Sequence, residues 1–200
     1  MALAMLDSIL SPEWEFRYYS FDSAWGDGER MASMRDGSGD SWSIVLSEHG
    51  AFVRGFDHES VIGSSLAGGL WPGLLDGLPA VFSAAAEEPA FTAGEVLEAS
   101  ACLWRLREDD QWHVGNVELP RGGNPDGADQ LFEILLDATP GSYVRFALDY
   151  YGQNLEENAV GAILALEPLT DKLVRRLNSE VSLADLAEDV TQIKYPPRLV

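Results

Sequence analysis

Residues 41–56 read Ser41-Trp-Ser-Ile-Val-Leu-Ser-Glu-His-Gly50-Ala-Phe-Val-Arg-Gly-Phe56, two apolar runs on either side of a short polar turn. β-branched and aromatic residues are typical of strands, and Ser47–Gly50 has the small and polar residues that favour a turn. A second turn, Asp36-Gly-Ser-Gly-Asp40, separates the first run from Arg30–Arg35. The spacing predicts an antiparallel meander, because strands joined by short connections pair antiparallel.

An alternation of apolar and polar residues extends this expected sheet in both directions along the chain. Within Trp14–Phe21, the apolar residues Trp14, Phe16 and Tyr18 alternate with charged ones, which predicts a half-buried strand. Ala99–Arg107 and Gln111–Leu119 predict a second hairpin. We therefore expect an antiparallel sheet of about five or six strands from the N-terminal 120 residues.

Helical signals dominate the chain from Asp126 to about residue 195. The apolar period changes from two to 3.6 there, and Leu131, Ile134 and Leu135 would share one helical face. Thr139-Pro140 predicts a helix start, and Gly152 its C-terminal stop. Further helices are expected at 156–166, at 170–177 and from residue 182 onward.

The order of these elements decides the fold class. Strands first and helices afterward indicate α+β, since a parallel sheet would need a crossover between consecutive strands. We expect a single α+β domain over residues 1–200. Within its first part, the apolar segment Trp71–Glu88 predicts a short turn of helix and then a longer helix that ends before Pro89.

Net charge limits the partners that the protein could bind. The chain has 33 acidic and 13 basic side chains, a formal net charge of −20. Such a field repels polyanions, so we expect no direct binding to nucleic acid. The same field would attract a basic protein partner. The sequence leaves the oligomeric state open.

Several features predict a cytoplasmic protein with no membrane segment. The N-terminus lacks the basic region of a signal peptide, and the longest uncharged stretch, Ser60–Leu75, is short and rich in glycine. Cys102 is the single cysteine, and it alternates with Trp104 and Leu106. This pattern predicts a buried core thiol rather than a nucleophile.

Five residues near the meander form the candidate partner or ligand contact: Asp36, Asp40, Asp57, His58 and Glu59. An imidazole between two carboxylates could move protons or bind a ligand. On extended backbone only Asp57 and Glu59 would converge on one side. The cluster therefore has two interpretations, a contact for a basic partner or a cleft for a small ligand, a metal or a substrate.

The turn Asp36–Asp40 also offers oxygen atoms at positions one, three and five of a calcium loop. Ser41 then stands where that loop needs glycine, and Ser47 where it needs a bidentate glutamate. The pattern favours a tight turn between strands. We expect no metal ion and no cofactor, and we assign no catalytic residue.

The segments Met34–Leu46 and Gly50–Ser60 resemble the central block of SMI1/KNR4-like (SUKH) domains. That block has a glycine-rich acidic turn, a hydrophobic strand, a glycine turn and a strand that ends in Asp-His-Glu, here Asp57 to Glu59. The resemblance implies a non-enzymatic binding role, commonly toxin immunity in bacteria. The segments Trp71–Pro79 and Ser182–Asp189 are similar to those of uncharacterised bacterial proteins.

These observations lead to two hypotheses. The first is an intracellular, acidic protein-interaction module, of the immunity type against a basic toxin. The alternative is an enzyme or a protein that binds a small ligand or a metal in a cleft near the five candidate residues. Convergence of those side chains in a pocket would favour the alternative.

Overall fold

The computed structural model describes residues 1–196, and the chain divides into two compact units. The first, here the helical unit, combines Met1–Ser23 with the chain from Glu133 onward. The second, here the sheet unit, is the continuous segment Ala24–Phe132. The α+β class is confirmed, and the single domain remains a prediction.

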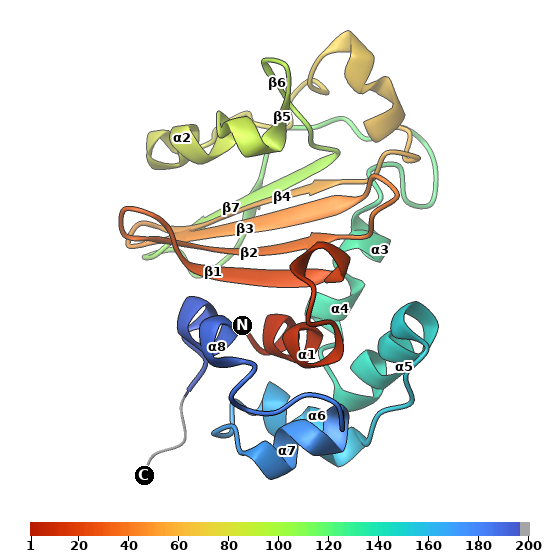
Figure 1. The fold of residues 1–200 in the computed structure, drawn as a ribbon. Coiled ribbons are helices and arrows are strands. Elements are labelled where there is room, and N and C mark those ends of the chain that lie inside the picture. Colours follow the sequence, from red (N-terminus) through yellow and green to blue (C-terminus); the bar gives the residue numbers. More distant parts are fainter. Residues whose placement is uncertain (197–200) are drawn as a thin grey trace. The chain divides into compact units, whose positions relative to one another are not determined.

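A six-stranded antiparallel sheet is the main element of the chain up to residue 114 (Figure 1). Its strands lie in the order β1-β2-β3-β4-β7-β8. Their bounds are β1 Tyr19–Gly26, β2 Glu29–Arg35, β3 Ser41–Ser47, β4 Gly50–Phe56, β7 Ala101–Leu106 and β8 His113–Val114. The meander and the second hairpin are therefore confirmed.

The strand register places large apolar residues in a row across one face of the sheet. Val45 pairs with Phe52, and Phe52 pairs with Trp104. Cys102 lies in the same buried cluster and is 4% exposed, so the prediction of a core thiol is confirmed. Gly50 closes the β3–β4 turn at φ +143°, where a Cβ atom would lie 2.1 Å from the Arg105 carbonyl oxygen.

The segment between β4 and β7 contributes most of the remaining residues of this cluster. Its elements are η2 Gly63–Gly68, η3 Ala80–Phe82, α2 Ser83–Ala86, η4 Pro89–Phe91, β5 Thr92–Ala93 and β6 Val96–Leu97. Phe82 stacks on Phe52 with ring centroids 6.4 Å apart. The helical segment expected before Pro89 is present but short, since η3 and α2 together cover residues 80–86. Residues 72–77 form turns, since Gly73 has φ +86° and lies too close to Asn116 for a side chain.

The helical unit is built around its N-terminal helix. Its elements are α1 Ala2–Leu10, η1 Trp14–Phe16, α4 Glu133–Leu136, α5 Pro140–Tyr151, α6 Glu157–Leu164, α7 Asp171–Leu177 and α8 Ala187–Ile193. α1 contacts α6, α7 and α8, and its Met5, Leu6 and Ile9 are fully buried. Within residues 1–196, no helix has both the length and the apolar character of a membrane span.

The start of the strand expected at Trp14–Phe21 is wrong, since only its last three residues belong to β1. Residues Trp14–Phe16 form a 3₁₀ turn, and Trp14 and Phe16 are 54% and 58% exposed. The Arg17 side chain explains the compact path, because it donates hydrogen bonds to the carbonyl oxygens of Ser11 and Pro12 and pairs with Asp189. The first strand begins only at Tyr19.

The single helix expected from Asp126 is divided in two. α3, Ala128–Leu131, belongs to the sheet unit, and α4 belongs to the helical unit. Phe132 separates the two helices, because its backbone angles, φ −105° and ψ 7°, are not helical. Leu131 is buried while Leu135 is 37% exposed, so they do not form one buried stripe.

The caps of the later helices follow the sequence closely. The Thr139 hydroxyl accepts a hydrogen bond from the Ser142 N–H, and Gly152 ends α5 in the left-handed conformation at φ 68°. α6 and α7 lie within the expected ranges. α8 begins at Ala187, later than Ser182, although Ser182 and Asp185 form the reciprocal contacts of a capping box.

Candidate functional site

Asp36 organises the turn between β2 and β3. One of its carboxylate oxygens, Oδ1, accepts hydrogen bonds from the backbone N–H groups of Ser38, Gly39 and Asp40 at 2.8, 3.1 and 3.0 Å. Burial alone would raise the pKa of Asp36, but these hydrogen bonds and that of the Ser38 hydroxyl outweigh burial and lower it. Asp36, the first position of the calcium-like pattern, therefore already has hydrogen-bond donors from its own turn.

Asp40 and His58 are the two candidate residues whose side chains meet. The His58 Nδ1 atom lies 2.7 Å from Asp40 Oδ1, and the His58 backbone N–H donates to the same oxygen at 3.0 Å. Both side chains are partly exposed. The hydrogen bond with Asp40 raises the pKa of His58 above its usual value of 6.5. This pair joins the β2–β3 turn to the end of β4.

Asp57 and Glu59 do not converge as expected. β4 ends at Phe56, and residues 57–60 form a turn rather than extended backbone. Asp57 is 8% exposed, and its Oδ1 accepts hydrogen bonds from the N–H groups of Glu59 and Ser60 at 2.9 and 2.8 Å. The Glu59 side chain is exposed. Asp57 therefore stabilises the turn, whereas Glu59 is available for contacts at the surface.

The five candidate residues thus form one ion pair, two carboxylate-capped turns and one exposed acid. Within residues 1–196, no three His, Cys, Asp or Glu side chains gather closely enough to hold a metal ion. Burial raises the pKa of Cys102 to about 12, so the thiol stays protonated near neutral pH.

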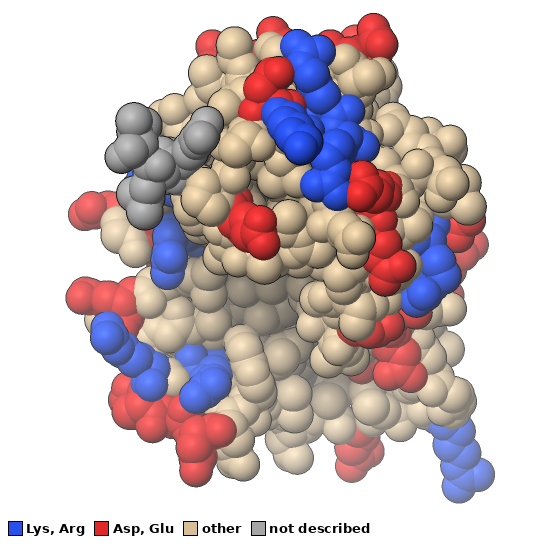
Figure 2. Space-filling view, turned by 90° about the horizontal axis from the view of Figure 1, so that it is seen from below, with Lys and Arg blue, Asp and Glu red and all other residues tan. Residues whose placement is uncertain are grey.

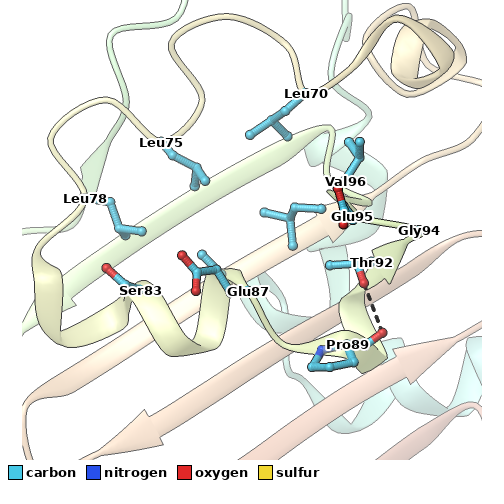
Figure 3. A pocket seen from close by; sticks show the side chains of 12 residues that line it. Leu70, Leu75, Leu78, Ser83, Glu87, Pro89, Thr92, Gly94, Glu95 and Val96 are labelled. Atoms are coloured by element: carbon cyan, nitrogen blue, oxygen red, sulfur yellow. Dashed lines mark hydrogen bonds between the residues drawn. The ribbon is translucent and has the colours of Figure 1, made fainter.

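A pocket of about 680 Å³ lies elsewhere in the sheet unit, between α2, the β5–β6 hairpin and the loop of residues 70–78. Leu70, Leu75 and Leu78 extend from the loop toward it, and the Glu87 carboxylate at the end of α2 points into the same space (Figure 3). Glu95 lies at the tip of the hairpin. No pocket was predicted here, although the glycines and prolines among the leucines from residue 70 to 79 indicated an interrupted segment.

A second feature that the sequence analysis missed is the buried carboxylate of Asp7 in the helical unit. Its oxygens accept hydrogen bonds from the hydroxyls of Tyr143 and Tyr151 at 2.5 and 2.8 Å. The backbone N–H groups of Tyr18 and Tyr19 donate to it at 2.9 and 2.6 Å. Burial raises the pKa of Asp7 to about 6 even though all four hydrogen bonds lower it. The side chain is fully buried, so it stabilises the fold and does not meet a ligand from solvent.

Comparisons with protein-family models, with curated proteins and with solved structures find no match to this chain.

Proposed function

We propose that this protein is a non-enzymatic interaction module that binds a basic protein partner through its acidic surface. The observation that carries the proposal is the excess of carboxylates. With 33 acidic and 13 basic side chains, one-to-one pairing would still leave twenty carboxylates without a Lys or Arg. A field of this sign favours the approach of a basic protein and speeds association.

The candidate residues give this proposal more support than the enzymatic alternative. Asp36 and Asp57 accept hydrogen bonds from neighbouring backbone groups, so neither carboxylate is held ready as a general acid or base. Glu59 is exposed, and the Asp40–His58 pair is partly exposed. Exposed charges of this kind serve partner orientation better than turnover.

Figure 2 bears on how the partner would be attracted. On the face drawn there, Asp and Glu side chains occur in several separate groups, most of them beside Lys or Arg. Attraction over that face would therefore come from the summed field rather than from one patch. Specific contacts need a more defined feature of the surface.

Toxin immunity, which the SUKH resemblance implies, is the specific form of this proposal in which the basic partner is a toxin. The product of a gene adjacent to this one is the first partner to test. A basic toxin encoded there should bind the purified protein and lose its activity in the complex. A neighbouring toxin that remains active in the complex would contradict the immunity form but not the binding module.

The general proposal can be tested with a display library of random peptides selected on the full chain. We expect the selected peptides to be enriched in Arg and Lys. Their affinity should fall steeply as salt rises from about 50 to about 300 mM, because the ions screen exposed charges. Selection of acidic peptides, or binding that does not respond to salt, would overturn the proposal.

A further inference from the structure

We propose that the pocket between α2 and the β5–β6 hairpin binds an apolar side chain of the basic partner, while flanking Lys or Arg residues of that partner pair with Glu87 and Glu95. This inference rests on the proposed function and names the place where the partner docks. It predicts a partner segment in which a leucine-like residue lies between basic residues.

The walls of the pocket are suited to an apolar side chain. Leu70, Leu75 and Leu78 approach it from the loop, as Figure 3 shows, and all three pack partly buried against the core cluster. Ala86 of α2 and Leu97 of β6 line it as well and are buried. The volume of about 680 Å³ is within the range of pockets that hold small ligands. A leucine or phenylalanine side chain would leave water on entering it, which favours binding.

The carboxylates beside these walls favour a partner segment with basic side chains. Glu87 and Glu95 are exposed and come from two different elements, the end of α2 and the hairpin turn. All residues that line the pocket are neutral or acidic. A basic side chain before the apolar anchor and another after it could therefore each meet a carboxylate. An acidic segment would be repelled from the same pocket.

The hairpin wall is held in place by the core of the sheet unit. Arg54 of β4 is 5% exposed, and its Nη1 donates a hydrogen bond to the Glu98 carbonyl oxygen at 2.7 Å. Its guanidinium group also lies over the Phe91 ring, 5.2 Å from the centroid. Glu98 and Phe91 flank the hairpin and are joined by a backbone hydrogen bond of 2.8 Å. A wall that is ordered before binding reduces the entropy lost when a partner docks.

Three fluorescein-labelled peptides test the chemistry of the occupant. The first has two leucines flanked on each side by two arginines, the second replaces the leucines with serine, and the third replaces the arginines with serine. Fluorescence anisotropy with the full chain should show binding of the first peptide. Each replacement should weaken binding about tenfold or more. Equal binding of the first two peptides would overturn the role of the apolar anchor.

Two charge-reversal variants locate the site. Glu87→Lys with Glu95→Lys changes the pocket, and Glu48→Lys with Glu108→Lys makes the same change in net charge at exposed positions that do not line it. The pocket variant should weaken binding of the first peptide by about tenfold more than the control variant. Thermal melts should show that both variants remain folded.

A third variant blocks the space itself. Ser83 is exposed and lines the pocket, so Ser83→Trp places a large ring there with little cost to folding. We expect a loss of affinity of about tenfold. Unchanged affinity in this variant, or equal losses in the two charge-reversal variants, would overturn the pocket as the docking place while the acidic module stands. If no basic peptide binds the wild-type chain at low salt, both this inference and the proposed function fail.

Discussion

Asp7 and Asp57 are both buried carboxylates, but the two units of the molecule satisfy them in opposite ways. In the sheet unit, Asp57 accepts hydrogen bonds from backbone N–H groups two and three residues further along the chain. In the helical unit, Asp7 accepts them from the hydroxyls of Tyr143 and Tyr151, which lie 136 and 144 residues away.

The difference shows how each unit is assembled. A polar group that its own turn satisfies can be desolvated as soon as the turn forms. The two tyrosine hydroxyls reach Asp7 only after distant parts of the chain have come together, and the same holds for the ion pair of Arg17 with Asp189, which is 172 residues away. The helical unit therefore depends on long-range polar contacts that the sheet unit does not need at Asp57.

The largest effect is expected from Asp7→Ala. The substitution removes the acceptor of four hydrogen bonds, among them that of the buried Tyr143 hydroxyl. The free energy of unfolding at pH 6 should fall by about 2–4 kcal/mol, as measured by chemical denaturation. Tyr143→Phe removes only one of the four donors to Asp7, so it should cost less. A loss below about 0.5 kcal/mol for Asp7→Ala would show that water replaces the network.

Titration of the same carboxyl should give the next largest effect. Burial raises the pKa of Asp7 to about 6 from a usual value of 3.8, so folding favours its protonated form. The stability that this preference contributes is fully present below about pH 3.8 and is lost as the pH rises through about 6.

The comparison of wild type with Asp7→Asn isolates this contribution. Between pH 5 and pH 7.5 the wild type should lose about 1–1.5 kcal/mol of unfolding free energy relative to Asp7→Asn. Both pH values lie above the isoelectric point of about 4.2, where the protein keeps a negative net charge. If the wild type instead gained unfolding free energy relative to Asp7→Asn as the pH rises, the four donors, rather than burial, would decide the pKa of Asp7.

Asp57→Ala should have a smaller effect on stability. Two backbone N–H groups of the turn lose their acceptor, as at a helix N-cap, for which the cost is about 1–2 kcal/mol. Asp57→Asn keeps a carbonyl oxygen in place of Oδ1 and should restore most of that loss. If Asp57→Ala were as costly as Asp7→Ala in the same denaturation experiment, the contrast between local and long-range satisfaction would be wrong.

The smallest effect concerns the Asp40–His58 pair, which is partly exposed. The hydrogen bond with Asp40 raises the pKa of His58 above 6.5. An NMR titration of the His58 ring should therefore have its midpoint above 6.5 in the wild type and closer to 6.5 in Asp40→Asn. Equal midpoints of the His58 ring in the two proteins would contradict this role of Asp40.

Most of the sheet could be predicted from the sequence because its signals are local. Ser47–Gly50 marks a turn, and the residues on either side of it have strand propensity, so β3 and β4 follow without distant information. The caps of α5 are equally local, since Thr139 and Gly152 act within one turn of helix. The nearly continuous apolar run of α1 gave no clear helical period, because this helix is buried on almost all sides.

The candidate site was predicted only in part. Sequence spacing placed Asp36 and Asp40 in a turn between two strands, and this turn exists, whereas extended backbone was expected at Asp57 and His58, where the chain instead turns. The contact between Asp40 and His58 needs the β2–β3 turn and the end of β4 to approach each other, which no spacing of residues encodes. The pocket between α2 and the β5–β6 hairpin forms only where three segments of the sheet unit meet. In the sequence, its residues therefore indicate no more than an interrupted helix and two separate glutamates.

The sequence by itself therefore determined the α+β class, the meander and the caps of the later helices, since each depends on residues within a few positions of one another. Only the tertiary structure decided the fate of Trp14 and Trp42, which lie in similar alternating patterns. Trp42 is 2% exposed and lies on β3, which has β2 and β4 paired on either side. Trp14 is 54% exposed because hydrogen bonds from Arg17 hold its segment in a turn, and the main side-chain partner of that arginine is near the other end of the chain.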